Sequence, residues 1–434
     1  MTISSSLNAG VSGLTANANQ LSAISDNIAN SATYGYKRAE SDFHSVVING
    51  GSATRYSAGG VRVSSARLID ERGSLIATSN PTDIAIDGRG FLPVTTISAI
   101  NNRTTVLPIA LATTGSFRPD ENGILRTSTG EVLMGWPANS DGTMNTFPRD
   151  TMGALVPVQI SASEYVGNPT TNMSLGVNLP ATATAAGSGA LPIDLAVEYY
   201  GNLGTSESLR VTFTPVIPAT GSSNQWTMTI ADSASGNAVI GEYQLTFDSS
   251  QADGGKLLSV TNISGGPYDA LTGEIALTVG GGGLQLSLFT PGGQYGMTQL
   301  SDRFAPTSIT KNGSPVATLT AVELDANGNL SAIYDQGFTR RIYQIPLVDV
   351  PNPNGLMVLS NQTYRVSPGS GPFYLWDAGD GPTGTTVGFS REESATDVAA
   401  ELTELIVTQR AYSSNAKVIQ TVDEMLQETT NIKR

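Results

Sequence analysis

A helical repeat of apolar residues at each end of the chain constrains the fold more than any other feature. Near the N-terminus, apolar or small residues recur at alternating spacings of four and three, the period of a helix with one apolar stripe. The same kind of repeat begins near residue 398. The stripes are Leu7, Val11, Leu14, Ala18, Leu21 and Ile28 at one end, and Val398, Leu402, Leu405, Ile406, Tyr412, Ile419 and Leu426 at the other.

The polar faces of both predicted helices limit how they can be stabilised. On the N-terminal one they consist mostly of Ser, Asn, Thr and Ala, so surface ion pairs contribute little. Such a helix gains its stability by burying its stripe on a partner. On the C-terminal one, Ser394 or Thr396 can cap the start, with Asp397 and Glu401 near the positive end of the helix dipole.

The partner of these helices is open to two interpretations. They can pair with each other on a β core, or they can pack against neighbouring molecules. Small, Gly-containing stretches lie next to both helices, "NSATYGY" on one side and "SPGSGPFYLWDAGDGPTGTTVGFS" on the other. We therefore predict linkers at 33–75 and 371–393, with helices that are tethered rather than docked and that become ordered on assembly.

Between the ends the apolar period changes to two, which predicts antiparallel strands with one buried face. Examples are "DIAIDGRGF", "NMSLGVNL" and "IDLAVEYY", each bounded by turn residues. A shift toward Thr, Ser, Ala and Gly near 149–158 indicates an inserted domain. The predicted fold is mainly β with terminal α-helices, and its β domains are nested antiparallel or barrel-like sheets. The predicted parts are an N-terminal helix (1–32), a linker or extended segment (33–75), a β domain (76–150 and 294–370) with an insert (151–293), a linker (371–393) and a C-terminal helix (394–434).

Composition excludes several classes of function. The chain has 0 Cys and 1 His, so thiol nucleophiles, disulfides and Cys- or His-based metal sites are excluded. Its formal net charge of -14 argues against nucleic-acid binding. No apolar run is long enough to span a bilayer, and the N-terminus lacks the pattern of a cleaved secretory signal, which alone would predict a cytosolic protein.

The chemical motifs that we considered are weak, and we predict no catalytic, cofactor-binding or metal-binding residue. "DANGNLSAIYDQ" has Asp325, Asn327 and Asn329 at calcium-loop spacing, but Leu330 and Gln336 stand where that loop needs Gly and Glu. An Asn-Gly hairpin turn explains it better. His44 is interpreted as an ordinary, partly exposed residue. A carboxylate-only glycosidase is the remaining enzymatic alternative.

Two long motifs resemble the flagellar rod–hook axial protein family of bacteria. The first combines a Ser-Gly-Leu helix with Asn-Ile-Ala-Asn and a Thr-x-Gly-aromatic-Lys turn, and the second is "DVAAELTELIVTQRAYSSNAKVIQTVDEML". The chain departs from the family pattern where Ala395 and Thr396 replace Asn-Val. The matching residues are Asn27, Ile28, Ala29, Asn30, Thr33, Gly35, Tyr36 and Lys37, and then Thr408, Gln409, Arg410, Tyr412, Asn415, Ala416, Lys417, Ile419, Thr421, Asp423 and Leu426.

The resemblance implies a structural, non-enzymatic subunit. Within the family, the length of the insert favours a hook-type member over a distal-rod type, which is the nearest alternative. Such a protein polymerises into a curved helical tube, with the terminal helices pairing as a coiled coil in its core, and acts as a universal joint between motor and filament. The implied partners are further copies of the chain, the distal rod, the hook cap, the hook–filament junction proteins and the type III export apparatus. The implied location is the extracellular flagellum, reached without a cleaved signal peptide.

Overall fold

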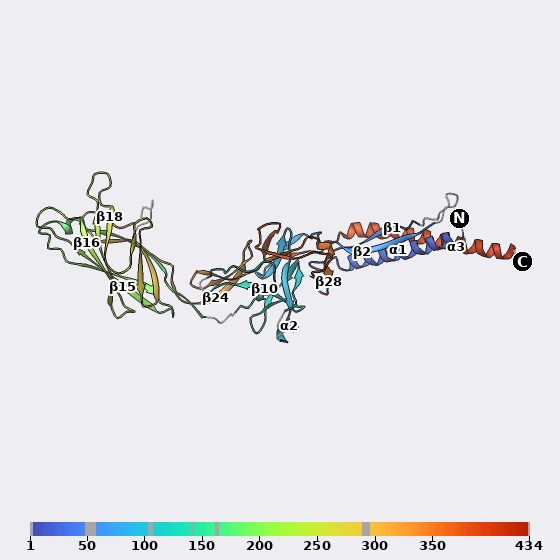
Figure 1. Ribbon diagram of the computed structural model, residues 1–434, viewed down its shortest axis with the longest axis horizontal. Helices are drawn as coiled ribbons and strands as arrows, with labels where there is room; N and C mark the ends of the chain where they lie inside the picture. The colour runs from blue at the N-terminus through green and yellow to red at the C-terminus, as the bar shows by residue number, and fades with distance from the viewer. Residues whose placement is uncertain are drawn as a thin grey trace. The chain divides into compact units, whose positions relative to one another are not determined.

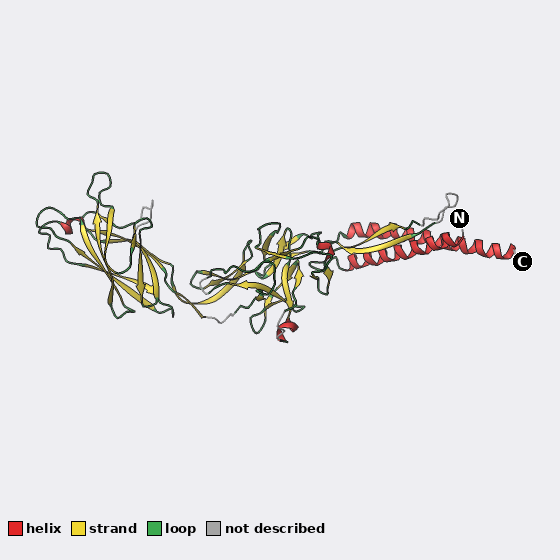
Figure 2. Ribbon diagram, in the orientation of Figure 1, coloured by secondary structure: helices red, strands yellow, loops and turns green. Residues whose placement is uncertain are grey.

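The computed structural model describes residues 3–47, 58–102, 107–139, 142–160, 165–288 and 296–432. Most of its elements are strands, and a long helix lies near each end of the chain, which confirms the predicted fold class (Figure 1 and Figure 2). The chain divides into two compact units. Unit 1 comprises Met1–Ser161, Ala321–Ile333 and Thr339–Arg434, and unit 2 comprises Ala162–Thr320 and Tyr334–Phe338.

The two long helices belong to unit 1 and pack side by side. Contacts between α1 (Ile3–Ala29) and α3 (Val398–Ile432) join early residues of one to late residues of the other, so the helices are antiparallel (Figure 1). The prediction of tethered, undocked helices is therefore wrong. Each helix finds its first partner in the other, because pairing hides a face that neither could hide alone.

The segment 33–75, predicted to be a linker or extended segment, is extended in part but packed against the rest of unit 1. It contains the antiparallel hairpin of β1 (Ala39–Ser45) and β2 (Val61–Arg67), which lies along α1, and it ends in β3 (Leu75–Ala77). A two-stranded hairpin is marginal alone. Here the Ser12 hydroxyl on α1 accepts the Val61 N–H at 3.1 Å, and Asn27 bonds to both backbone groups of Ala39.

The start of α3 also differs from expectation. The carboxylate of Asp397 accepts the N–H groups of Ala399 at 2.9 Å and Ala400 at 3.3 Å, so Asp397 is the capping residue. Neither Ser394 nor Thr396 has this role, since the helix begins at Val398, immediately after Asp397.

Unit 1 also contains a β region built from one large sheet and several small ones. One sheet has the order β25-β26-β10-β5-β6-β29-β28, a second has β31-β4-β7, and the pairs β3–β32 and β27–β30 flank them. The segment 371–393, predicted to be a linker, supplies β30 (Tyr374–Trp376), β31 (Thr385–Gly388) and β32 (Ser390–Glu392), and that prediction is wrong. The other bounds are β4 (Asp83–Asp87), β5 (Leu92–Thr96), α2 (Ile97–Asn101), β6 (Ala110–Ala112), β7 (Thr114–Ser116), β8 (Arg118–Pro119), β9 (Leu125–Arg126), β10 (Glu131–Pro137), β11 (Val156–Pro157), β25 (Asn329–Tyr334), β26 (Thr339–Gln344), β27 (Leu347–Asp349), η2 (Pro353–Gly355), β28 (Met357–Val358) and β29 (Thr363–Arg365).

Unit 2 is a sandwich of two sheets around a core of alternating strand residues. One sheet is the antiparallel meander of β14 (Ile193–Tyr200), β15 (Ser206–Pro215), β16 (Gln225–Asp232), β17 (Ala238–Phe247) and β18 (Leu257–Ser264). The other has the order β19-β20-β21-β13-β22, with β23 also on β13. Its members are β13 (Asn172–Leu179), β19 (Tyr268–Asp269), β20 (Glu274–Val279), β21 (Gly282–Ser287), β22 (Thr298–Gln299) and β23 (Ala305–Lys311), and η1 (Ala181–Thr184) follows β13.

Two features of unit 2 differ from the prediction. β13 pairs in parallel with β21 and β22, although all strands were expected to be antiparallel. This pairing is accessible because the whole meander serves as the crossover that parallel neighbours need. The unit also begins at 162 and extends to 320, whereas the insert was predicted at 151–293, because β23 adds to the sheet of β13 instead of resuming the first β domain.

The segment with calcium-loop spacing forms the turn between β24 (Ser314–Leu324) and β25. The Asp325 carboxylate accepts the N–H groups of Asn327 at 2.9 Å and Asn329 at 2.7 Å, and Gly328 takes a φ of 79°. At the start of unit 2, β12 (Tyr165–Asn168) pairs with β24.

Candidate functional site

The seam between α1 and α3 is lined mainly by small and polar residues. On both helices the residues that meet or are buried recur at spacings of three, four or seven. This spacing keeps one face of each helix on the other. We define the seam as Gly10, Gly13, Asn17, Gln20, Ile24 and Asn27 of α1 with Glu401, Glu404, Thr408, Asn415, Ile419 and Val422 of α3.

Specific contacts fix the register of the seam. The Gln20 amide donates to the Glu404 carboxylate at 2.6 Å, and the Asn27 amide donates to that of Glu401 at 2.9 Å. At the other end the backbones approach closely, because a β-carbon added at Gly13 would lie 2.9 Å from the Asn415 amide nitrogen. Small residues and matched polar groups therefore determine which faces meet.

The predicted apolar stripe of α1 is not the seam but the row one residue further along. Leu7, Leu14, Leu21 and Ile28 are half-buried, and Val11 is 47% exposed. One residue corresponds to a rotation of about 100° around the helix. The stripe therefore flanks the seam and keeps part of its apolar surface uncovered.

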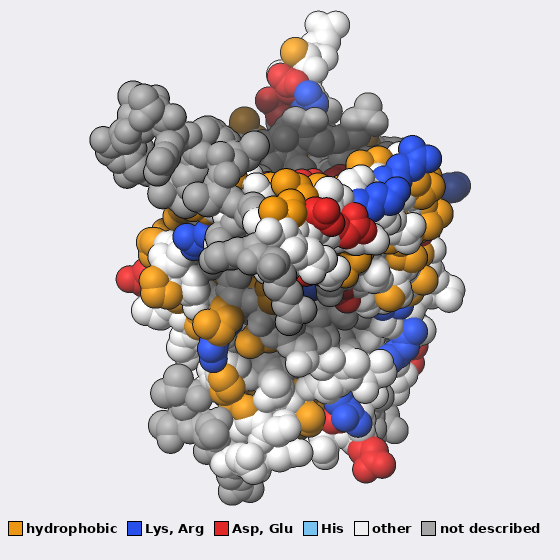
Figure 3. Space-filling model, turned by 90° about the vertical axis from the view of Figure 1, so that its right-hand side faces the viewer, with side chains coloured by type: hydrophobic (Ala, Val, Ile, Leu, Met, Phe, Trp, Pro, Cys, Tyr) orange, Lys and Arg blue, Asp and Glu red, His pale blue; other side chains and the backbone are white. Residues whose placement is uncertain are grey.

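On α3 the apolar residues are even less covered. Leu405 and Ile419 are half-buried, whereas Val398, Leu402, Ile406, Tyr412 and Leu426 are 36–51% exposed. Val407, Val418, Met425 and Ile432 are exposed too, and helical spacing places two rows of exposed apolar residues on α3, one on each side of the seam. Figure 3 views the molecule from the right-hand end of Figure 1, where the two helices lie, and shows patches of hydrophobic side chains among uncharged atoms. We define row A as Val398, Leu402 and Ile406, and row B as Val407, Val418, Met425 and Ile432.

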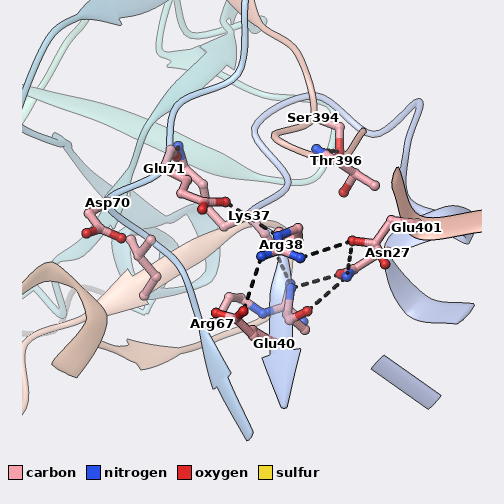
Figure 4. A network of polar contacts seen from close by, with 12 residues as sticks. Asn27, Lys37, Arg38, Glu40, Arg67, Asp70, Glu71, Ser394, Thr396 and Glu401 are labelled. Carbon is pink, nitrogen blue, oxygen red and sulfur yellow. Dashed lines mark hydrogen bonds and ion pairs between the residues drawn. The ribbon is translucent and has the colours of Figure 1, made fainter. Parts of the chain in front are cut away.

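At the end of the seam that is nearest the start of α3, Asn27 joins three parts of unit 1 (Figure 4). Its side chain donates to the Ala39 carbonyl at 2.9 Å and accepts the Ala39 N–H at 2.8 Å. The same amide group reaches Glu401, and the Tyr36 hydroxyl lies 3.1 Å from its oxygen. Since Asn27 is 1% exposed, these bonds satisfy an amide that water cannot reach.

A buried ion pair ties the N-terminal turn to the strand that precedes α3. Lys37 Nζ lies 2.6 Å from Glu392 Oε1, and the two side chains are 0% and 1% exposed. Lys37 also donates to the Glu71 carbonyl at 2.6 Å, and Glu392 accepts the Gly73 N–H at 2.9 Å. Burial lowers the pKa of Lys37, and the Glu392 carboxylate opposes that shift.

Tyr36 adds a second link beside this pair. Its hydroxyl lies 2.9 Å from Asp26 Oδ2, and the Arg67 guanidinium lies 4.8 Å from the centre of its ring. Burial and the bond to Asp26 raise the pKa of Tyr36 to about 12. The N–H of Ala395 donates to the Tyr36 carbonyl at 3.0 Å, so this turn also holds the approach to α3.

The residues that link the end of α1, the turn after it and the approach to α3 are called the junction, and they are Asn27, Gly35, Tyr36, Lys37, Arg38, Arg72, Glu392 and Glu401. Arg38 and Glu401 form its charged rim. Arg38 Nη1 lies 3.4 Å from Glu401 Oε1, and its other nitrogens lie 3.5 Å from Glu40 and 3.6 Å from Glu71 (Figure 4). Burial lowers the pKa of Arg38, but the three carboxylates outweigh it and the net shift is upward. Burial raises the pKa of Glu401, which Asn27 and Arg38 only partly oppose.

The structure brings part of the predicted motif together and leaves the rest apart. Asn27, Gly35, Tyr36 and Lys37 meet at the junction, and the Asn30 amide donates back to Asp26 at the end of α1. In contrast, Ala29, Gln409, Arg410 and Asp423 are exposed, Ile28 is half-buried, and Asn415 belongs to the seam.

Several junction residues were not predicted. Glu401 was predicted only to lie near the positive end of the helix dipole, yet it is 2% exposed and forms part of the junction. Glu392, Arg38 and Arg72 were not singled out. A signal was present for Glu401, since it lies seven residues before Thr408 and fourteen before Asn415 on one helical row. His44 is exposed, as expected, with Nε2 2.9 Å from the Ser64 hydroxyl.

Comparisons with known proteins match both ends and the whole length of the chain. The family model described as "Flagella basal body rod protein" matches residues 7–37, and "Flagellar basal body rod FlgEFG protein C-terminal" matches residues 388–432. Flagellar hook protein FlgE of Brucella suis biovar 1 (strain 1330) is 32% identical over 100% of both chains. The chain belongs to the flagellar hook protein family.

Other hook proteins are similar over the same span. Flagellar hook protein FlgE of Caulobacter vibrioides is 27% identical over 100% of both chains, and that of Salmonella typhimurium is 26% identical over 99% of this chain and 100% of its own length. The crystal structure of Helicobacter pylori flagellar hook protein FlgE2 gives a TM-score of 0.45 at 14% identity, covering 73% of this chain and 99% of that one. Both family models fall on the junction and the seam.

The described residues were also compared with what a membrane span or a metal site requires. Among the described residues of this hook protein, no helix combines the length and the apolar character needed to cross a membrane. The described part of the chain also has no group of three or more His, Cys, Asp or Glu side chains placed to hold a metal ion.

Proposed function

We propose that this chain is the structural subunit of a flagellar hook and polymerises through rows A and B and the α1 stripe. The observation that carries the proposal is that α1 and α3 pair mainly through small and polar residues, while the side chains of rows A and B stay exposed and the α1 stripe stays half-buried. Val407 is 61% exposed and Ile432 78% exposed. Exposed apolar patches of this kind are typical of surfaces that bind another protein.

The polymer is a helical tube built by head-to-tail contacts. A heterologous contact joins two different patches, one on each subunit. When the rotation between successive subunits does not close a ring, the polymer remains open and further subunits can be added. Row A, row B and the α1 stripe are different surfaces on one helix pair, as such a contact requires. The subunit-packing residues are those of the two predicted stripes, extended by row B.

Bending of the tube is assigned to the β units. Each unit has its own core, and polar surfaces between neighbouring copies allow small sliding movements at low cost. The packed helices would resist twisting. On this basis the hook acts as a universal joint that passes torque from motor to filament while it turns in a bent shape.

Location and partners follow from the same proposal. The subunit is non-enzymatic, resides in the extracellular hook and is exported by the flagellar type III apparatus without a cleaved signal peptide. It contacts the distal rod at one end of the hook and the hook cap or junction proteins at the other. The full-length similarity to hook proteins and the matches to rod family models support these assignments.

Electron microscopy of concentrated protein tests polymerisation. Ile406→Asp places a carboxylate in the middle of row A, where Ile406 is 51% exposed, so the monomer should fold and the tubes should be lost. Gln420→Glu adds the same charge at an exposed polar position of α3 and should leave the tubes intact. Intact tubes from Ile406→Asp, or no tubes from the unmodified chain at any concentration, would contradict the proposal.

A further inference from the structure

The last strand of the meander in unit 2 forms a free sheet edge without charged residues. In the described residues of this sheet, the order β14-β15-β16-β17-β18 leaves β18 at one end, paired with β17 alone. Its sequence, "LLSVTNIS", contains no Asp, Glu, Lys, Arg or Pro. Natural edge strands usually carry such residues to prevent pairing with another chain, so β18 lacks a common protection.

Two irregularities in β18 each present a large aliphatic side chain. Thr246 pairs with Ser259 while Phe247 pairs with Leu257, so Leu258 is an extra residue between them. The same pattern at the other end leaves Ile263 as an extra residue between Asn262 and Ser264. Leu258 is 64% exposed and Ile263 is 54% exposed.

The positions of these residues argue for a binding role. A bulge usually blunts an edge or redirects a side chain. Here both bulges direct an apolar side chain outward, and the two residues lie five positions apart, or about 16 Å along a strand. Val260, between them, packs against the core instead. Within the part of the chain that the structure describes, the edge thus combines backbone groups that no other strand pairs with and two separated apolar anchors.

We propose that the β18 edge, with Leu258 and Ile263 as anchors, is a contact between unit 2 of one copy and a second copy of this chain. The inference rests on the proposed polymer and adds a second interface to it. In such a polymer the copies must approach one another although each carries a net charge of -14, so charge selects an uncharged surface for their contact. An edge of eight uncharged residues is where two such chains approach at the lowest electrostatic cost.

The absence of cysteine from the chain makes the test specific. Leu258→Cys and Ile263→Cys each introduce a single thiol at the edge, and Leu191→Cys places one at an aliphatic residue outside β18 that is 80% exposed. Each variant is co-assembled with a large excess of unmodified chain, so that tubes form whether or not the variant weakens the contact. Thiol modification by a maleimide is then timed in tubes and in dilute monomer, and a second sample carries a benzophenone maleimide for photo-crosslinking.

The expected result is that the thiols at 258 and 263 react several-fold more slowly in tubes than in monomer, whereas the thiol at 191 reacts equally in both. Photo-crosslinks from 258 and 263 should join two chains in tubes only. Normal tubes with fully reactive edge thiols, or photo-crosslinks from 258 and 263 that stay within one chain in tubes, would overturn the inference and leave the proposed function intact. Failure of the unmodified chain to form tubes would overturn both.

Discussion

The buried pair Lys37–Glu392 offers a quantitative test of how the junction holds the helices to the β region of unit 1. Replacing Lys37 by Met keeps the volume and removes the ammonium group. It leaves Glu392 as a charge that is 1% exposed, with the Gly73 N–H and Arg72 as its remaining partners. Removal of one partner from a buried ion pair costs about 3–5 kcal/mol. Arg72 Nη1, 3.8 Å from Glu392 Oε2, should keep the loss near 3 kcal/mol.

Replacing both residues isolates the interaction. Lys37→Met with Glu392→Met removes both buried charges, so the double variant should lose less stability than the sum of the single variants, with a coupling of about 2 kcal/mol. Recovery should be incomplete, because Arg72 then loses its carboxylate partner, and burial already lowers the pKa of Arg72.

Thermal unfolding of dilute monomer, with hydrogen exchange read by mass spectrometry, measures these changes unit by unit. At roughly 2–4 °C per kcal/mol, Lys37→Met should lower the transition of unit 1 by about 6–12 °C. Unit 2 has a separate core and serves as an internal control. A shift of unit 1 below about 1 kcal/mol, or single costs that add without coupling, would refute the reasoning.

Three further changes test other parts of the structure. Gly35→Ala should destabilise unit 1 by about 1–3 kcal/mol, because Gly35 has a φ of 70° and the added β-carbon would lie 2.9 Å from the Thr114 side chain. Gly153→Ala is the control, since its added β-carbon would have no atom within 4 Å. Chemical denaturation compares the stability of the two variants. Phe213 is fully buried in the core of unit 2, so Phe213→Ala should lower the stability of unit 2 by about 3–5 kcal/mol. Hydrogen exchange in unit 1 should be unchanged. Burial opposes ionisation of Asp232, but the hydrogen bonds that its carboxylate accepts outweigh burial and lower its pKa. Unit 2 should therefore lose stability as the pH falls from about 4 through that lowered pKa. Thermal unfolding at a series of pH values should show this loss in the unmodified chain, and Asp232→Asn should remove it.

The strands of both units were largely predictable because their signal is local. Alternation in "IDLAVEYY" or "WTMTI" records which face is buried, whatever the neighbouring strand is. Pairing is not local. Nothing in "NMSLGVNL" indicates that β13 runs parallel to β21, since that depends on a return of the chain about a hundred residues later. The two predicted linkers failed for a related reason. Their Gly and Ser content resembled flexible segments, but the first contains a hairpin that packs along α1, and both contain short strands whose partners are distant in sequence.

The helix seam shows the limit of reading a stripe as a partner surface. Periodicity located the apolar row of α1 correctly, yet pairing within the chain uses the row one residue earlier, where Gly13 and Asn27 allow close approach and specific hydrogen bonds. If the largest aliphatic residues were buried between α1 and α3 of one chain, the monomer would have no exposed apolar surface left to bury on assembly. Here the polar seam fixes the register of the pair, and the apolar rows remain uncovered. Exchanging these roles, with apolar residues at Gln20 and Glu404 and polar ones along row A, should therefore give a more stable monomer that forms no tubes.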